Sequence, residues 1–516
     1  MLRGLRNMAM WFEHRLVLRE TFWPIVRHPV PRSLRRKVGW MYVFGSTAMT
    51  LLMLQIVTGI ALSMVYVPSA GEAFESLEYL NYQVPLGWML RAIHNWAATL
   101  MIVMVVIHMA QVFLAGAYKY PRELTWMLGV ILFFCTVGMA FTGQVLRWDA
   151  DSYWGLGVGA AMIGRIPYIG PALVDLMMGS PILGGETLSR FFALHVYIIP
   201  GILFATLGLH LYLVVRKGIS EPPEEGNEVD PATYDEEYEA LIADGAGDPF
   251  FPGPMARDAF FIGLTLLLVL GLAIFCGPDG PGLPPDPANV AAEPVPDWYF
   301  LSLFSVLALS PRSLETYIIL IGPLVVVAVM LMFPLWASRG ERHPYRRPVA
   351  VLSVIFIFLG VGVLTWLGYK EPWSPHMNAW TADAVPVNIV KRLSPTEMQG
   401  AVVLQLKACR NCHALDGVGG ERGPDLTHVG SRLDRPALVR QVIQGGGNMP
   451  AYGKQLTGPQ VTALVDFLSA LRPPERPPPR GAAPTRPSAA GRAPPRSSSP
   501  GRPPPPAPPP PRPMPP

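Results

Sequence analysis

Long apolar runs separated by short polar segments dominate this chain. Seven of the runs are long enough to cross a hydrocarbon core as helices, which takes about 20 residues each. They cover residues 39–67, 86–116, 124–145, 189–215, 258–276, 314–337 and 349–369. The pattern predicts an all-α fold, with a bundle of four transmembrane helices followed, after a polar connector, by three more.

Composition and loop charge extend this prediction. Half of the 516 residues are hydrophobic and 15% are charged, as in an integral membrane protein, and a net charge of +4 gives no reason to expect nucleic acid as a partner. The N-terminal segment and the loops after the second, fourth and sixth helices hold 18 lysines and arginines, whereas the opposite loops hold three. Because basic loops stay in the cytoplasm, we expect a multi-pass protein of a bacterial inner membrane with a cytoplasmic N-terminus and an extracytoplasmic C-terminal region.

Polar segments divide the chain into six predicted parts. These are a basic N-terminal segment (1–38), a four-helix membrane unit (39–217), an acidic connector (218–256), a three-helix membrane unit (257–370), a small all-α domain (385–472) and a Pro/Arg-rich tail (473–516). We expect the connector to be a solvated loop. The tail cannot bury a core and is predicted to be disordered, either inert or a tether for an acidic partner.

Four histidines lie inside the apolar runs. His94 and His108 are 14 residues apart, and His195 and His210 are 15 apart. Fourteen helical residues rise about 21 Å, which fits inside a core of about 30 Å. The predicted topology puts His94 with His195 near the outer face and His108 with His210 near the inner face. Two imidazoles per iron suit two electron-transferring hemes, although a membrane histidine can also be a packing or hydrogen-bonding residue.

Glycines repeat this spacing in two other helices. The pairs are Gly45 with Gly59 in the first helix and Gly129 with Gly143 in the third, each 14 residues apart. Glycine lets a flat porphyrin approach the backbone, and it is also common where membrane helices pack; the shared period favours heme binding. Arg91, one turn before His94, is a candidate partner for a heme propionate, with a solvated helix-end arginine as the alternative.

These residues resemble a known family. Residues 10–218 look like cytochrome b6 and residues 248–370 look like subunit IV of b6f-type complexes. The matching segments are WFEHRL at 11–16, QIVTG at 55–59, PRELTW at 121–126 and the two histidine spacings. The resemblance implies a subunit of a quinol-oxidising membrane complex that is dimeric and contains two b hemes.

The loop before the sixth helix carries the segment Pro296-Asp297-Trp298-Tyr299. It resembles the family's PEWY motif, whose carboxylate accepts a proton from quinol, with Asp in place of Glu. A carboxylate suits this task when burial moves its pKa toward ambient pH. The resemblance makes Asp297 the catalytic proton acceptor and places Tyr299 in the same pocket. The alternative is a loop turn with an aromatic residue at the membrane interface.

The sequence departs from the family at two positions. Val43 stands where cytochrome b6 has a cysteine that anchors an additional heme, so covalent attachment of that heme is not expected. Gln111 stands three residues after His108, where the family usually has an arginine. Propionate binding at the inner heme is therefore expected to be built differently.

The small domain carries a covalent heme motif. Cys409-Arg410-Asn411-Cys412-His413 has the CxxCH pattern, in which two thiols form thioethers and the histidine binds iron. Ser394 with Glu397 and Thr457 with Gln460 form predicted capping boxes that begin helices on either side of it.

The second axial ligand of this heme is predicted to be a methionine. Met449 lies in the glycine-rich loop 445–450, and His428 is the competing candidate. The whole stretch resembles a class I cytochrome c domain, and Pro424 matches the proline whose carbonyl orients the heme histidine in that family.

Together these features predict a cytochrome b–c fusion subunit of a bacterial quinol:cytochrome c oxidoreductase. By resemblance, quinol (slightly favouring menaquinol) is oxidised at the outer face, and quinone is reduced near the cytoplasmic face. A separate Rieske iron–sulfur protein and a periplasmic cytochrome c or similar acceptor are the expected partners. Two other functions remain open, a diheme membrane anchor that conducts electrons for a dehydrogenase and a non-enzymatic heme sensor.

Overall fold

The computed structural model describes residues 2–473, apart from 18–19, 21–22, 25, 36, 180–182, 244, 287–295, 311, 371–383, 408, 421–422, 446–448, 450–451 and 454. The predicted disordered tail from residue 474 onward lies outside the described residues, as does most of the glycine-rich loop around Met449.

The seven predicted transmembrane helices are confirmed. Each is apolar over a length sufficient to cross a bilayer. They are α3 (Phe44–Ser63), α5 (Gly87–Leu114), α6 (Glu123–Val145), α9 (Gly185–Ala193) continued by η3 (Leu194–Ile198) and α10 (Ile199–Lys217), α12 (Gly253–Cys276), α14 (Arg312–Trp336) and α15 (Pro348–Tyr369). The first is preceded by a 3₁₀ helix, η2 (Lys37–Tyr42).

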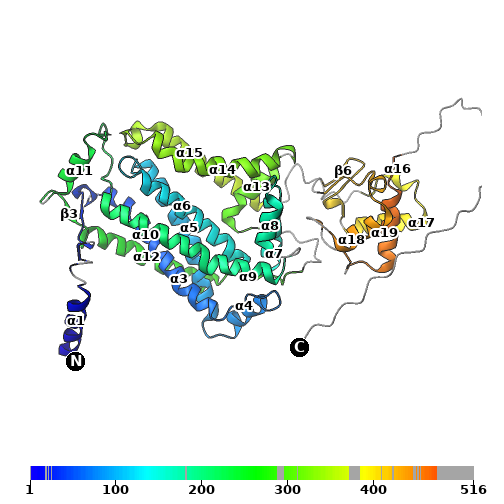
Figure 1. Cartoon of the computed structure of the whole chain (residues 1–516), viewed down its shortest axis with the longest axis horizontal. Coiled ribbons are helices and arrows are strands. Elements are labelled where there is room, and N and C mark those ends of the chain that lie inside the picture. Colours follow the sequence, from blue (N-terminus) through cyan, green and yellow to red (C-terminus); the bar gives the residue numbers. More distant parts are fainter. Residues whose placement is uncertain are drawn as a thin grey trace, which may run out of the picture. The chain divides into compact units, whose positions relative to one another are not determined.

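The first four spans form two tightly packed helix pairs (Figure 1). Helix α3 packs along α5, and α6 packs along α10. Within the described residues, α5 and the η3–α10 span, which carry the four histidines, share no comparably extensive contact. Helix α12 lies against α5 and α14 against α6, so the second unit encloses the first from two sides.

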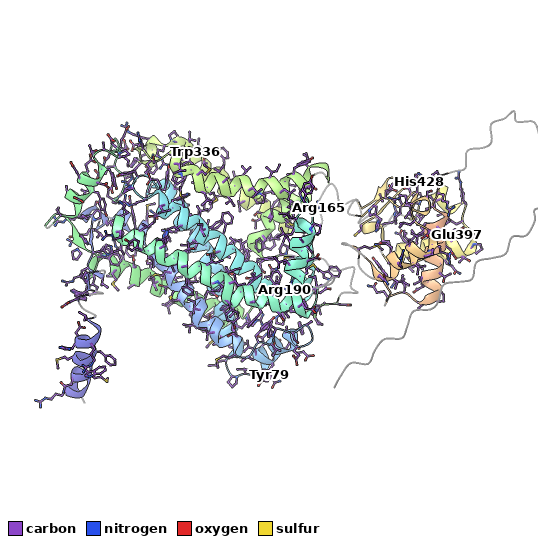
Figure 2. The ribbon with its side chains drawn as sticks, viewed as in Figure 1. Tyr79, Arg165, Arg190, Trp336, Glu397 and His428 are labelled. Carbon is purple, nitrogen blue, oxygen red and sulfur yellow. The ribbon has the colours of Figure 1, made fainter. Side chains whose placement is uncertain are left out.

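Short helices cover both ends of the bundle. Helices α7 (Ala150–Gly164) and α8 (Gly170–Met178) lie at one end beside α9, while α11 (Tyr234–Ile242) lies at the opposite end (Figure 1). Arg165 and Arg190 are at the α7–α8 end, and Trp336 lies toward the other (Figure 2). Two further short helices are α4 (Ala73–Tyr82) and α13 (Leu301–Leu309), and α13 packs on α15.

Most of the connector is exposed, as predicted for a solvated loop, but it also forms short strands and a helix and is anchored by a few buried residues. Its strand β2 (Glu228–Val229) pairs with β4 (Gly340–Glu341), and β3 (Asp248–Pro249) pairs with β1 (Pro29–Val30). Ser220, Glu221, Val229, Tyr234 and Asp248 are all buried. The buried acidic residues have charged partners far away in the chain: Glu221 pairs with Arg342, and Asp248 pairs with Arg35.

Residues 385–471 share one hydrophobic core, which includes Leu404, Leu464 and Phe467. Its elements are α16 (Val387–Val390), α17 (Pro395–Leu406), η7 (Cys409–Asn411), β5 (Ala414–Leu415), β6 (Val418–Gly419), η8 (Val429–Ser431), α18 (Arg435–Gln444) and α19 (Gly458–Ala470). Both predicted capping boxes are confirmed, at the starts of α17 and α19. Helices α17 and α19 approach closely at Gly400, where a side chain would collide with the backbone of Ala463.

Candidate functional site

The structure brings the four membrane histidines together in two pairs. His94 and His108 lie on α5, His195 lies in η3 and His210 lies on α10. The imidazoles of His94 and His195 are near enough for direct electrostatic interaction, and so are those of His108 and His210. These are the pairs that the sequence predicted from helix direction.

A π-helical turn explains the unequal spacing of the two histidine pairs. Residues 194–198 form η3, a π turn that includes His195, and α10 continues directly from it with Pro200 near its start. A π turn takes up one residue more than an α turn. The 15 residues from His195 to His210 therefore advance about as far along the helix axis as the 14 purely α-helical residues from His94 to His108.

His94 and His195 are held by the same hydrogen-bond arrangement. Thr58 Oγ1 lies 2.8 Å from His94 Nδ1, and Thr142 Oγ1 lies 2.9 Å from His195 Nδ1. Each threonine hydroxyl donates to a carbonyl of its own helix, at Leu54 and Gly138 respectively. The hydroxyl proton is thereby committed, so each Nδ1–H donates to its threonine. The Nε2 lone pair is left for a metal, as in most histidine-ligated centres.

The hydrogen bonds of His108 and His210 are less symmetric than those of the first pair. His210 Nδ1 donates to the carbonyl oxygen of Thr125 at 3.0 Å. Within the described residues, the buried Nδ1 atom of His108 has no hydrogen-bond partner. An unsatisfied buried nitrogen costs free energy, and among the described residues no hydrogen bond at Nδ1 orients the ring of His108 as it does the rings of the other three histidines.

All four predicted glycines face these imidazoles. A Cβ atom built at each would meet a histidine Cε1 atom. The separations are 3.1 Å for Gly45 and His108, 3.3 Å for Gly59 and His94, 3.7 Å for Gly129 and His210, and 2.9 Å for Gly143 and His195. Their absent side chains make room for the histidine rings, on helices α3 and α6 that flank the pair α5 and α10. These residues therefore fit two heme groups, each held between a histidine of α5 and one of η3–α10.

Arg91 is not a solvated helix-end residue, so that alternative was wrong. It is buried on α5, where its guanidinium donates to Asn81 Oδ1 at 2.8 Å and to the carbonyl of Asp279. Contact with a heme propionate stays a prediction for this side chain.

Asp297 and Tyr299 come together at the start of η4 (Trp298–Phe300). The Tyr299 hydroxyl donates to Asp297 Oδ2 at 2.5 Å. Burial raises the pKa of Asp297 above the usual value of a carboxyl, against the lowering effects of the Tyr299 hydrogen bond and of Arg147. Burial also raises the pKa of Tyr299, so its phenol stays protonated. A half-buried carboxylate of raised pKa can accept a proton and later release it.

In the heme motif of the small domain, His413 makes the hydrogen bond to Pro424 that the sequence predicted. His413 Nδ1 donates to the carbonyl of Pro424 at 2.7 Å, leaving Nε2 for iron. Met449 packs against the domain core together with Cys409. The Gln441 amide donates to Met449 Sδ at 3.4 Å, a contact that the sequence analysis missed.

Comparison with known proteins assigns both parts of the chain. Three family models match: "Cytochrome b/b6/petB" over residues 29–218, "Cytochrome b(C-terminal)/b6/petD" over 284–385 and "Cytochrome C oxidase, cbb3-type, subunit III" over 395–468. Cytochrome b of Rhodobacter capsulatus is 31% identical over 390 residues, which are 72% of this chain and 86% of the relative. The chain belongs to the cytochrome b family.

Two further comparisons agree with this family. The menaquinol:cytochrome c reductase cytochrome b subunit of Geobacillus thermodenitrificans is 37% identical over 222 residues, 42% of this chain and 99% of that subunit. A chain of a hyperthermophilic respiratory Complex III has the same fold, with a TM-score of 0.57 and 24% identity, over 78% of this chain and 96% of that one. The protein is thus a multi-pass membrane fusion of cytochrome b and cytochrome c domains, which imply heme b and heme c.

One charged cluster of this cytochrome b escaped the sequence analysis. Arg147, just after α6, pairs with Asp149 (Nε–Oδ2, 3.4 Å), with Asp279 (Nη1–Oδ2, 2.5 Å) and with Asp297 (Nη1–Oδ1, 3.6 Å). The side chain of Arg147 is only 15% exposed. These partners lie up to 150 residues from Arg147 in the sequence. The one available signal was a charged residue in an outer loop otherwise poor in basic residues.

Proposed function

We propose that this chain is the cytochrome b–c subunit of a bacterial quinol:cytochrome c oxidoreductase that builds a proton gradient. Two paired sets of histidines, each faced by glycines and leaving Nε2 available, are the observation that carries the proposal. The relatives named above as reductase and Complex III subunits support it.

Defined residues would hold each cofactor. His94 and His195 would ligate the outer heme b, and His108 and His210 the inner one. Cys409 and Cys412 would bind heme c covalently, with His413 and Met449 as its axial ligands. When bound, these hemes supply one-electron carriers near each membrane face and on the small domain.

The quinol site would lie at Asp297. Its carboxylate accepts a proton from the quinol hydroxyl, while Tyr299 fixes the orientation of that carboxylate by donating to Oδ2. The raised pKa of Asp297 brings its proton affinity nearer to ambient pH, so that the proton can be released afterwards to the outer aqueous phase. Menaquinol is the substrate that we favour.

The proposed complex contains further electron carriers and has a defined orientation in the membrane. A separate Rieske iron–sulfur protein takes one electron from quinol and passes it to the c domain, which stands in for cytochrome c1 or f. The other electron crosses to a quinone near the cytoplasmic face. The complex lies in the cytoplasmic membrane as a homodimer, with the N-terminus inside and the c domain outside.

Replacement of His94 in the full complex tests this function. His94→Leu removes one ligand of the outer pair, so we expect loss of about half of the b-band absorbance and of quinol-driven reduction of an added c-type cytochrome. Asp297→Asn should retain both b hemes but lose most of the quinol oxidation. An unchanged b band in His94→Leu would refute the heme assignment, and wild-type turnover in Asp297→Asn would refute the quinol site.

A further inference from the structure

The cluster around Arg147 joins three segments that are far apart in the chain. Asp149 caps helix α7, where its Oδ1 accepts from the backbone N–H of Ser152 at 2.9 Å. Its other oxygen accepts from the backbone N–H of Gly282 at 3.1 Å. The segment after α12 that carries Asp279 is thereby fixed to the start of α7, and Arg147 lies between them.

Three carboxylates contact the Arg147 guanidinium, so no single one of them is needed to balance its charge. One nitrogen, Nη1, contacts both Asp279 and Asp297, and Nε faces Asp149. If Asp297 becomes neutral, the guanidinium still has two anionic partners. Protonation of Asp297 therefore does not leave a buried arginine uncompensated, which would otherwise strongly oppose it.

We propose that Arg147, balanced by Asp149 and Asp279, is the positioning residue that sets the pH at which Asp297 accepts the proton of quinol. This inference rests on the proposed quinol oxidation. In that step a quinol O–H bond breaks and an O–H bond forms on Asp297, while the electron leaves to the iron–sulfur acceptor. Arg147 touches neither the quinol nor its electron acceptor; it acts through the charge of Asp297.

Among the described residues, four charged or titratable groups influence the charge of Asp297. They are Tyr299 from its own segment, Arg147 and Asp149 from the α6–α7 junction, and Asp279 from the segment after α12. Among the helices that contact η4, α13 contains no charged residue, and α15 contributes only Tyr369, with Lys370 directly after it. Helix α6, whose Phe141 contacts Phe300, has Glu123 as its charged residue, at its opposite end. Arg147 and Tyr299 favour the ionised carboxylate, whereas burial, Asp279 and Asp149 oppose it.

The proposal predicts that replacing Arg147 and replacing Asp279 shift the pH dependence of the quinol oxidation rate in opposite directions. Quinol oxidation needs ionised Asp297, so the rate falls as the pH drops through the pKa of that group. Arg147→Gln removes the favourable charge and should move this acidic limb upward by about one pH unit. Asp279→Asn frees Arg147 for Asp297 and should move the limb downward. Arg147→Lys retains the charge and should restore the limb toward its wild-type position.

The ratio of b to c hemes checks that each variant assembles. The side chain of Asp279 is 58% exposed, so its replacement is not expected to disturb folding. Arg190→Gln is the matched control, because this arginine at the same end of the bundle donates to the backbone carbonyl of Asp175. An unmoved limb in assembled Arg147→Gln, or an equal shift in Arg147→Lys, would overturn the inference. Full turnover in Asp297→Asn would instead overturn the proposed function.

Discussion

Hydrogen bonds to Nδ1 distinguish the four membrane histidines from one another. His94 and His195 donate to threonine hydroxyls on neighbouring helices, and His210 donates to a backbone carbonyl. An acceptor at Nδ1 orients the ring and makes Nε2 a stronger donor to a metal. Both histidines of the proposed outer heme, but only one of the inner heme, are thus oriented by a hydrogen bond at Nδ1. We therefore expect the two hemes to differ in reduction potential.

Thr58→Val tests this difference at the outer heme. Valine keeps the shape of threonine but removes the acceptor of the His94 N–H, so Nε2 becomes a weaker iron ligand and the oxidised heme is less well stabilised. We expect the potential of the outer heme to rise while that of the inner heme stays unchanged, as measured by redox titration of the b band. Retention of the outer heme during dilution should weaken by about tenfold.

Thr50→Val is the control for that experiment. Thr50 also lies on α3, but its hydroxyl donates only to the carbonyl of Ser46, at 2.9 Å. Its replacement should leave both potentials unchanged. Equal titration curves for the Thr58→Val variant and the wild type would show that the hydrogen bond does not tune this ligand.

At the scale of elements, a buried ion pair fixes the connector to the second membrane unit. Arg342 contacts Glu221, and both side chains are almost fully buried. Tyr234 on α11 donates to the other oxygen of Glu221 at 2.9 Å, and Arg122 before α6 donates to the Tyr234 hydroxyl at 2.7 Å. These side-chain contacts, from Arg122 through Tyr234 and Glu221 to Arg342, therefore connect the two membrane units and the connector between them.

Glu221→Ala should release this connector. Removal of one partner leaves the buried Arg342 charge uncompensated, at a cost of about 3 kcal/mol. Protease cleavage within 222–247 should then accelerate by about two orders of magnitude, since cleavage follows the population of the opened segment. Glu225→Ala is the matched control, because Glu225 is half exposed and its ion pair with Arg346 has a separation of 3.8 Å, so it should change the rate little. Equal cleavage of both variants would contradict the ion-pair argument.

The same elements show what the sequence predicts well. The membrane helices follow from uninterrupted apolar runs, and the histidine pairing follows from spacing and helix direction, both of which are local properties. The anchoring of the connector was not predicted, because its acidic composition resembles that of a solvated loop and Arg342, the partner of Glu221, lies 121 residues away. Arg147 was missed for the same reason, since only the folded chain brings it to Asp297.

For the molecule as a whole, the proposed electron route depends on the c domain. The apolar bundle provides paired histidines, and the small domain carries the CxxCH motif and Met449 that would hold heme c. In the proposed topology, the seven spans put the small domain on the side of the membrane opposite the basic N-terminus. If the c domain replaces a separate cytochrome, electrons from the Rieske protein have to pass through it.

Joint replacement of Cys409 and Cys412 by alanine tests this route in the full-length chain. Without thioether bonds the c heme is not retained, so a pyridine hemochrome spectrum should change from two b hemes and one c heme to two b hemes alone. Steady-state reduction of an added periplasmic-type acceptor should fall to background, because the iron–sulfur protein has no carrier to reduce. Cys276→Ala, at the end of α12, should alter neither measurement. Reduction of the acceptor at the full rate without heme c would mean that electrons leave by another subunit and that the fused domain has a different role.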